Sequence, residues 1–231
     1  MQGLFITGTD TGVGKTWVTC ALIKAGLEAG GRMGAYKPAC SGAETNRQGQ
    51  LFWSDVEALR FALGGTVSRE RIGPQCFRAP LAPPAAAEAE GQHVDWDRIL
   101  SGAAAWQAEC DMLLVEGAGG WHCPLTDKLT FADLAQALGF PVLVVAANRL
   151  GVINHTLLTL EAIRNRGLSV AGVVLCHVSP DGDQASSSHR DLLLRYADLP
   201  WLGETRYGEQ TIHTRRGRLA GLDWMTPTSG G

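Results

Sequence analysis

The sequence predicts an α/β fold: a single domain built on a parallel sheet with helices on both faces. Short continuous apolar runs alternate along the chain with segments whose apolar residues recur at helical spacing. Two of these runs lead directly into glycine-rich stretches, as strands of such sheets often do at ligand sites. The 231 residues are 45% hydrophobic, which is enough for one substantial core.

Strands and helices can be placed in order along the chain. Strands are expected at residues 4–7, 33–36, 111–115, 142–147 and 170–175, and the last two are expected to be buried. Helices are expected around residues 18–25, 130–138, 153–163 and 192–196. Glycines at 30, 139 and 167 end the first three helices. Residues 74–89, rich in proline and alanine, are expected to be irregular, and residues 226–231 to form a loose tail after a domain of residues 1–225.

Charge and composition exclude several classes of protein. The net charge is −3 and no basic run occurs, which argues against a nucleic-acid partner. The first residues lack a charged lead with an apolar stretch of signal length, and residues 141–147 are too few to cross a membrane. These features indicate a cytoplasmic protein with no membrane partner. The six cysteines show no Cys-x-x-Cys spacing and are interpreted as reduced structural residues, although a catalytic thiol beside a base stays open.

Residues 8–16, Gly-Thr-Asp-Thr-Gly-Val-Gly-Lys-Thr, lie between the first strand and the first helix. Glycines in this setting let backbone N–H groups surround phosphate oxygens, and the following helix adds its dipole. Lys15 can reach the β- and γ-phosphates, and the Thr16 hydroxyl can bind magnesium. Thr9 stands where the general spacing has glycine. A glycine-rich turn with a solvated lysine is the alternative, but the strand–turn–helix context favours a P-loop that binds ATP and Mg²⁺.

Two further residues follow strands at the edge where ligands of parallel sheets collect. Lys37 could stabilise negative charge on a transferring phosphoryl group, or it could be a solvated loop lysine. Glu116 could bind magnesium or be an ordinary carboxylate at a strand end. Because residues 117–120 are Gly-Ala-Gly-Gly, which permits close backbone approach to a ligand, metal binding is favoured.

Two helix starts are ambiguous. Ser54 and Glu57 fit a capping box, so that Asp55 would only complement the helix dipole, and the pattern by itself favours this reading. Asn154 and His155 open a later helix, whose free N–H groups suit a carboxylate. Asn154 could instead be a simple cap.

At these residues the chain resembles the dethiobiotin synthetases of biotin biosynthesis. The combination of the loop, Tyr-Lys-Pro and the glycine stretch is more specific than the loop alone. The matching segments are residues 7–16, 36–38 with 41–42, 54–55, 115–120, 124–125, 130–133, 150–151 and 153–155. In this family the loop also carries threonine where Thr9 stands here.

The resemblance implies an ATP- and Mg²⁺-dependent cyclo-ligase acting on 7,8-diaminononanoate. One amine would take up CO2 to give a carbamate, ATP would phosphorylate it to a carbamic-phosphoric anhydride, and the second amine would close a cyclic urea. Such an enzyme must exclude water and align the reacting groups. Lys15 and Lys37 would be catalytic, and Thr16, Asp55 and Glu116 would hold the metal.

The resemblance further implies two binding sets and a homodimer with shared active sites. The nucleotide set is Gly12, Val13, Gly14, Lys15, Thr16, Trp17, Asp55, Glu116, Gly119, Cys176 and His177. The substrate set is Thr11, Lys37, Ser41, Gly119, Gly151, Val152, Ile153 and Asn154. In that arrangement, residues 151–154 receive the carboxylate of substrate bound by the partner subunit, and a two-fold axis makes each contact twice.

The chain departs from the family at the expected base-binding residues. Cys176 and His177 replace a common asparagine and aspartate, and residues 205–207, Thr-Arg-Tyr, replace a segment with proline and tryptophan. A thiol cannot copy the paired donor and acceptor of an amide, so preference for ATP over other triphosphates is open.

Three alternative functions are weighed. Switch ATPases of the chromosome-partitioning type carry an extra lysine early in the loop, which residues 8–11 lack. Amide synthetases of the cobalamin pathway bring a glutaminase domain, for which this chain is too short. A small-molecule kinase would release a stable phosphorylated product.

Overall fold

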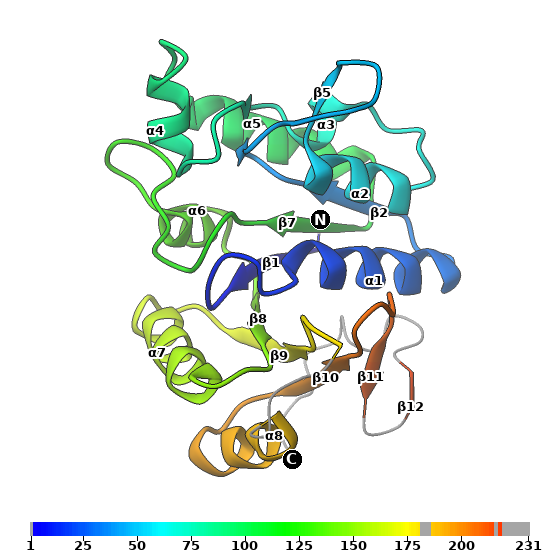
Figure 1. Ribbon diagram of the computed structural model, residues 1–231, viewed down its shortest axis with the longest axis vertical. Helices are drawn as coiled ribbons and strands as arrows, with labels where there is room; N and C mark the ends of the chain where they lie inside the picture. The colour runs from blue at the N-terminus through cyan, green and yellow to red at the C-terminus, as the bar shows by residue number, and fades with distance from the viewer. Residues whose placement is uncertain (1, 181–185, 215–216, 219–231) are drawn as a thin grey trace.

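The computed structural model describes residues 2–180, 186–214 and 217–218 (Figure 1). Its central sheet has the strand order β12-β11-β10-β9-β8-β1-β7-β2. Neighbours from β2 to β10 pair in parallel, whereas β11 and β12 pair antiparallel. The strands are β1 (Gln2–Gly8), β2 (Met33–Tyr36), β7 (Met112–Glu116), β8 (Val142–Ala147), β9 (Val170–Cys176), β10 (Trp201–Thr205), β11 (Ile212–Thr214) and β12 (Gly217–Arg218).

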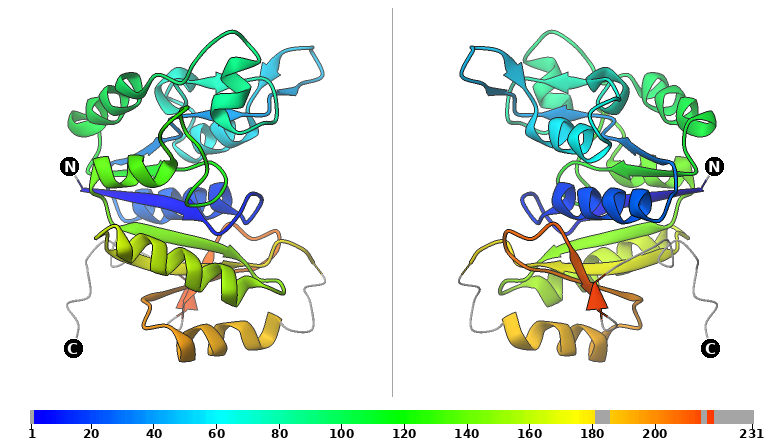
Figure 2. Two further views of the ribbon diagram at one scale, coloured as in Figure 1. Left: turned by 90° about the vertical axis from the view of Figure 1, so that its left-hand side faces the viewer. Right: turned by 90° about the vertical axis from the view of Figure 1, so that its right-hand side faces the viewer.

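Helices cover both faces of this sheet. The helices are α1 (Lys15–Glu28), α2 (Ser54–Ala62), α3 (Arg69–Ile72), α4 (Pro83–Glu88), α5 (Trp96–Ala105), α6 (Phe131–Leu138), α7 (Val152–Asn165) and α8 (Ser186–Tyr196), with a 3₁₀ turn at Trp106–Ala108. The two side views show α1 and α2 in front of one face and α5, α6 and α7 in front of the other (Figure 2). The predicted parallel α/β architecture is confirmed, and the predicted strands and the first three predicted helices match elements to within about three residues at either end. The last predicted helix, residues 192–196, is the C-terminal part of α8, which begins six residues earlier.

The middle of the sheet is buried on both sides. Phe5 and Ile6 of β1 are fully buried, and all residues of β7 and β8 are buried. Strands covered on both faces read as continuous apolar runs, which is why they were visible in the sequence. Because β1 lies between β7 and β8, the loop that follows it emerges at the centre of the carboxyl edge, where open parallel sheets bind ligands.

Two small ribbons lie beside the β2 edge (Figure 1). Strand β3 (Cys40–Ser41) pairs in parallel with β6 (Cys76–Phe77), and β4 (Glu44–Thr45) pairs antiparallel with β5 (Leu51–Phe52). The prediction that residues 74–89 are irregular is therefore wrong in part, since β6 and α4 lie within them. Strands of two residues are too short to leave a periodic pattern in the sequence.

The helix starts correct two other expectations. The capping box expected at Ser54 is wrong: Trp53 is the N-cap of α2, with no side-chain cap, and Glu57 instead forms ion pairs with Arg60 and Arg69. The capping role weighed for Asn154 is also wrong, because α7 already begins at Val152 after Gly151. A true capping box occurs at α6, as described next.

Helix α6 confirms its predicted span. Its N-cap Thr130 donates from both its N–H and its hydroxyl to Asp133 at 2.7 Å, and Gly139 ends the helix with a φ of 66°. The predicted tail at residues 226–231 lies outside the described residues. Over residues 2–180, 186–214 and 217–218, no helix combines the length and apolar character needed to cross a bilayer.

Candidate functional site

The loop between β1 and α1 turns sharply at two glycines, as phosphate-binding loops do. Gly12 and Gly14 have φ values of 71° and 95°, which side chains other than glycine rarely adopt. The N–H of Thr9 donates to Val145 O at 3.0 Å and anchors the loop to β8. Val18 N–H bonds to Gly14 O, so that the first turn of α1 begins directly beneath the loop.

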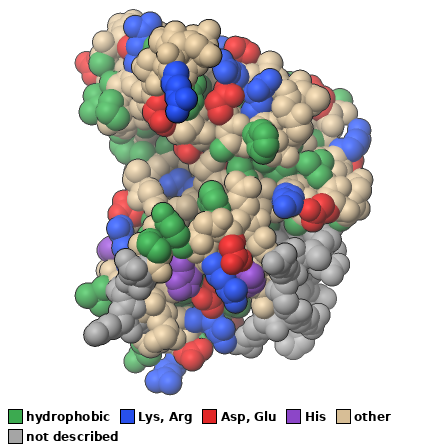
Figure 3. All heavy atoms as spheres, turned by 45° about the vertical axis from the view of Figure 1, so that its right-hand side comes forward, with side chains coloured by type: hydrophobic (Ala, Val, Ile, Leu, Met, Phe, Trp, Pro, Cys, Tyr) green, Lys and Arg blue, Asp and Glu red, His purple; other side chains and the backbone are tan. Residues whose placement is uncertain are grey.

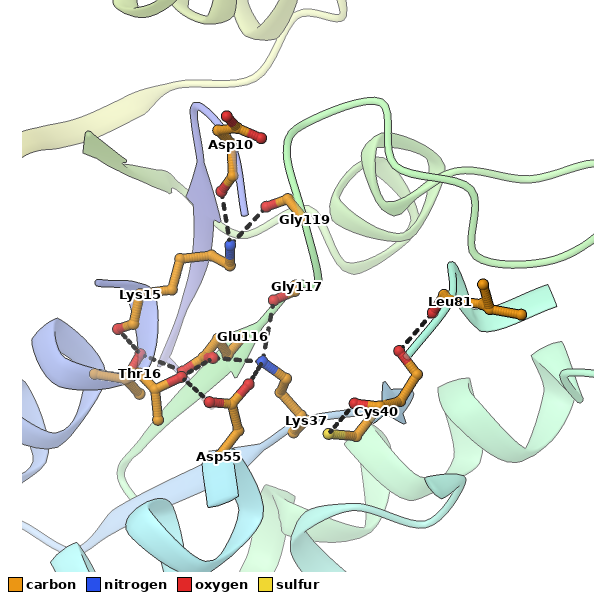
Figure 4. A network of polar contacts seen from close by, with 12 residues as sticks. Asp10, Lys15, Thr16, Lys37, Cys40, Asp55, Leu81, Glu116, Gly117 and Gly119 are labelled. Atoms are coloured by element: carbon orange, nitrogen blue, oxygen red, sulfur yellow. Dashed lines mark hydrogen bonds and ion pairs between the residues drawn. The ribbon is translucent and has the colours of Figure 1, made fainter. Parts of the chain in front are cut away.

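Lys15 points from the first turn of α1 toward the glycine stretch that follows β7 (Figure 4). Its Nζ donates to Gly119 O at 2.6 Å and to Asp10 O at 3.0 Å. Burial lowers the pKa of Lys15 to about 8, and the neighbouring charge of Lys37 adds to this effect. The two hydrogen-bond acceptors are neutral carbonyls. A phosphate anion would therefore provide Lys15 with a negatively charged partner, which these two carbonyls do not.

Lys37 lies between two carboxylates (Figure 4). Its Nζ is 2.6 Å from Oε1 of Glu116 and 2.7 Å from Oδ2 of Asp55. The Thr16 hydroxyl completes the cluster, at 2.7 Å from Glu116 Oε1 and 2.8 Å from Asp55 Oδ1. Glu116 is fully buried and Lys37 is only 2% exposed. The sequence pattern around Asp55 favoured a role in stabilising the helix dipole, and only the family resemblance implied metal binding. In the structure, Asp55 contacts Lys37 and Thr16.

Burial and ion pairing act in opposite directions in this cluster. Burial alone would lower the pKa of Lys37, but Glu116 and Asp55 outweigh it, so the pKa is raised. Burial would likewise raise the pKa of Asp55, but Lys37 outweighs it and the pKa is lowered. Lys37 and Asp55 are therefore held in their charged forms.

Thr19 is a member of the cluster that the sequence analysis missed. Its hydroxyl is 2.7 Å from Oε2 of Glu116 and 2.9 Å from Lys15 O, and the residue is fully buried. Thr19 lies one helical turn after Thr16, so it shares the face of α1 that looks toward β7. This spacing of three residues from Thr16 is the feature of the sequence that could have identified Thr19.

The oxygen atoms of the cluster fit a magnesium site. Thr16, Asp55 and Glu116 bring a hydroxyl and two carboxylates together, and Mg²⁺ prefers oxygen ligands. Among the residues that the structure describes, no group of three or more His, Cys, Asp or Glu side chains could hold a metal ion. A site with only two carboxylates is of the kind in which bound phosphates and water complete the coordination.

The cluster forms part of the wall of a cavity of about 600 Å³. The residues that line this cavity include the predicted residues Thr11, Gly12, Gly14, Lys15, Thr16, Trp17, Lys37, Ser41, Asp55 and Gly119. Residues that were not predicted also line it, namely Cys40, Pro80, Leu81, Ala82, Pro83, Ala118 and Cys123. The Ser41 hydroxyl donates to Leu81 O at 2.6 Å and ties two walls together. The structural interpretation of the cysteines is thus incomplete, since Cys40 and Cys123 face this cavity.

A second cavity, of about 610 Å³, lies beside the β10 and β11 strands. Its lining includes His177, Arg190, Glu204, Glu209 and His213. One face of the molecule shows histidine, basic and acidic side chains gathered on its lower part, below a hollow (Figure 3).

The structure separates the predicted pair Cys176 and His177. Cys176 is buried, and its Sγ lies 3.1 Å from the position that a Cβ on Gly14 would take, so it packs beneath the loop. His177 lines the second cavity, with Nε2 3.2 Å from Asn148 Nδ2 and 3.4 Å from Glu204 Oε2.

Val13 and Trp17 flank the loop in different ways. Val13 is buried beneath it and lines neither cavity. Trp17 lines the first cavity, and its Nε1 donates to the backbone oxygen of Glu209, a lining residue of the second, at 2.6 Å. Trp17 thus links the two cavities.

The remaining predicted substrate residues lie elsewhere. Gly151, with a φ of 94°, precedes α7, whose first residues are Val152, Ile153 and Asn154. None of these four lines either of the two cavities. Asn154 is exposed, whereas Val152 is buried. An ion pair of 3.3 Å between Arg149 and Asp10 links this turn to the loop.

Comparisons with known proteins found similar sequences and a similar fold. A family model described as "AAA domain" matches residues 2–214. An ATP-dependent dethiobiotin synthetase BioD of Anaeromyxobacter dehalogenans (strain 2CP-C) is 49% identical, over 87% of this chain and 91% of that protein. BioD 1 of Escherichia coli O157:H7 is 40% identical, over 87% and 88%. Among solved structures, the MinC:MinD cell division complex of Aquifex aeolicus matches with a TM-score of 0.51 and 14% identity, over 89% of this chain and 81% of that chain, which shows a shared fold alone.

Proposed function

The chain belongs to the dethiobiotin synthetase family and is an ATP-dependent ligase, and we propose that it converts 7,8-diaminononanoate and CO2 to dethiobiotin in the cytoplasm. The observation that carries the proposal is the convergence of Lys15, Lys37, Thr16 and Asp55 at one wall of a single cavity, with the buried Glu116 directly behind Lys37 and Thr16. Two buried ammonium groups beside a P-loop suit a reaction in which a phosphoryl group passes to an acidic acceptor.

The reaction has three steps. One substrate amine adds to CO2 with loss of a proton, and the resulting carbamate oxygen attacks the γ-phosphorus of ATP, so that ADP leaves. The second amine then attacks the carbamoyl carbon and phosphate leaves as the cyclic urea closes. Lys15 and Lys37 neutralise charge on the phosphoryl oxygens, and the cavity walls limit access of water to the carbamate.

The other residues bind and orient the reactants. Thr16, Asp55 and Glu116 would hold Mg²⁺, which supplies positive charge beside the phosphates when bound. Thr11, Ser41 and Gly119 line the same cavity and would contact the diamine and its carbamate. Residues 151–154 would receive the substrate carboxylate from the partner subunit of a homodimer, which accounts for their distance from the cavity.

The second cavity would take the nucleobase. His177, on its wall, is placed to contact a base edge, whereas Cys176 would act only by packing under Gly14. Competition between ATP and other triphosphates tests this assignment.

Product analysis tests the proposed reaction. The protein is incubated with ATP, Mg²⁺, bicarbonate and 7,8-diaminononanoate, and the expected product is the cyclic urea, identified by its mass. A stable phosphorylated diamine would indicate a kinase instead. ATP hydrolysis that does not depend on the diamine would indicate a switch ATPase.

A variant tests the role of Lys37. Lys37→Ala should abolish turnover while nucleotide binding stays measurable, because the loop and Lys15 still contact the phosphates. Lys24→Ala, the same change on the exposed face of α1, is the control and should leave turnover intact. Turnover of Lys37→Ala at the wild-type rate would contradict a catalytic role.

A further inference from the structure

We propose that Lys37 is a built-in counter-ion that occupies the cation position of the nucleotide-free site, so that a divalent metal binds tightly there only together with nucleotide. The inference rests on the proposed function in one respect, since it takes Thr16, Asp55 and Glu116 as the metal ligands. It concerns a state of the protein that precedes the reaction.

The contacts of Lys37 use the oxygens that a metal ion needs. Its ammonium lies 2.6 Å from Glu116 Oε1 and 2.7 Å from Asp55 Oδ2. The same Oε1 also accepts from Thr16, at 2.7 Å. Hydrogen-bond lengths this short leave no room for an ion between the ammonium and the carboxylates. A metal ion that binds both of these oxygens from the side of the ammonium must therefore displace Lys37.

Charge leads to the same conclusion. With Lys37 in place, the two carboxylates carry one compensating positive charge at a site where Glu116 is fully buried. A divalent ion added beside the ammonium would place three positive charges against two negative ones, and of these groups only Asp55, with 42% of its side chain exposed, is screened by water. Like charges at such separations repel strongly in this environment. Exchange of one cation for the other is favoured over joint occupancy.

Nucleotide offers Lys37 an alternative partner. Its side chain lines the cavity that contains the P-loop, so a triphosphate bound there brings anionic oxygens within its reach. Within the protein, the third oxygen near its Nζ is Gly117 O, at the long distance of 3.5 Å. Nucleotide would thus draw Lys37 away from the carboxylates and leave them to the metal. Binding of metal and nucleotide is then positively coupled.

Lys15 provides an internal contrast. It lines the same cavity, but it donates to the backbone oxygens of Asp10 and Gly119 and to neither carboxylate. Removing Lys15 changes the local charge by the same amount as removing Lys37, without releasing a metal ligand. The two lysines therefore separate direct competition from a general charge effect.

The test measures Mn²⁺ binding to nucleotide-free protein by the electron paramagnetic resonance signal of the free ion. Lys37→Met should bind Mn²⁺ at least about tenfold more tightly than wild type, a difference of one unit in log Kd. Lys15→Met should tighten binding much less. Equal tightening in both variants would reduce the effect to net charge and overturn the inference, as would unchanged Mn²⁺ binding in folded Lys37→Met.

Thermal unfolding gives a second readout that also covers a destabilised variant. Lys37→Met leaves two carboxylates without their cation, so its Tm should rise on addition of Mn²⁺, while that of wild type should not, because ligand binding to the folded state raises Tm. If Lys37→Met is unfolded without metal, Lys37→Gln replaces it, since an amide still donates a hydrogen bond but carries no charge. Mn²⁺ affinity and Tm response of Lys37→Gln equal to those of wild type would refute the inference.

These measurements are independent of product formation. If the protein forms no cyclic urea but Mn²⁺ binding tightens specifically in the Lys37 variant, the proposed function is wrong and the counter-ion role is supported. If the protein forms the cyclic urea but Mn²⁺ binding does not tighten in this variant, the proposed function is supported and the counter-ion role is wrong.

Discussion

The hydroxyl of Thr19 lies 2.7 Å from Oε2 of Glu116, on the opposite side of the carboxylate from Lys37 and Thr16, which contact Oε1. Both oxygens of a fully buried carboxylate are thereby satisfied, and its orientation is fixed. The hydrogen bonds of the Thr19 hydroxyl go to Glu116 and to the backbone of Lys15. It is a positioning residue.

Replacing Thr19 with valine should therefore affect stability and activity together. Loss of the donor leaves a buried carboxylate oxygen unpaired, which should lower the free energy of unfolding by about 1–3 kcal/mol in urea denaturation. Turnover should fall about tenfold, with a higher Mg²⁺ requirement, because Glu116 is less well oriented.

Thr156→Val is the matched control for this change. Thr156 is equally buried, and its hydroxyl finds no partner within the part of the chain that the structure describes. The valine should therefore leave stability unchanged or improved and turnover intact. Equal losses in the two variants would mean that the contact with Glu116 is unimportant.

The pKa of Lys15 predicts a pH dependence of nucleotide binding. This pKa is lowered to about 8, mainly by burial. A bound phosphate favours the charged ammonium, so binding above pH 8 should take up a proton and weaken by up to about tenfold per pH unit. Calorimetry in two buffers of different ionisation enthalpy measures the uptake. Lys15→Met should bind weakly, with no such proton uptake.

The same shift affects folding with the opposite consequence at high pH. Because the folded pKa of about 8 lies below the ordinary value of 10.5, the unfolded chain holds more protons between these two values. The free energy of unfolding should therefore gain a favourable contribution from Lys15 as pH rises from 8 toward 10.5. Chemical denaturation of wild type and Lys15→Met across this range compares the two slopes, and identical slopes would contradict the shift.

Two glycines of the loop should respond differently to alanine. Both adopt a positive φ, but a Cβ at Gly12 meets open space, whereas at Gly14 it would lie 3.1 Å from Cys176 Sγ. Gly12→Ala should incur only backbone strain of about 1–2 kcal/mol, and Gly14→Ala should cost more because a buried strand must also shift. Tm and nucleotide affinity should both rank wild type first, Gly12→Ala second and Gly14→Ala last. The reverse order of the variants would argue against packing of Cys176 on the loop.

Asn154→Ala tests the shared active site. Asn154 lies in the first turn of α7, away from the cavity of Lys15, so its loss should raise the KM for the diamine while the Kd for ATP stays the same. Glu161→Ala, an exposed change farther along α7, should alter neither quantity. Diamine kinetics of Asn154→Ala equal to those of wild type would remove the proposal that residues 151–154 bind substrate.

The sequence was most informative where physical constraints act locally. Continuous apolar runs located the central strands, and the strand–turn–helix context located Lys15 and Thr16. Lys37 and Glu116 could be placed together because Lys37 follows β2 and Glu116 ends β7, and the carboxyl ends of these adjacent parallel strands meet at one edge.

Tertiary contacts between distant segments could not be predicted in this way. Asp55 comes from a segment inserted between β2 and β7, and its neighbours Ser54 and Glu57 match the sequence pattern of a capping box that the structure does not form. Along a strand, side chains alternate between faces, but when both faces are covered the residue types do not reveal which face a side chain takes. The sequence therefore could not distinguish the roles of Cys176 and His177.

The hydrogen bond from Trp17 to Glu209 spans 192 residues of the chain. Synthesis proceeds from the N-terminus, so the phosphate loop leaves the ribosome long before the strands that close the second cavity around Glu209 and His213. A nascent chain that has just exposed this loop still lacks the hydrogen bond from α1 to Glu209 and the walls of the second cavity. Nucleotide should therefore bind only late in the synthesis and folding of the chain.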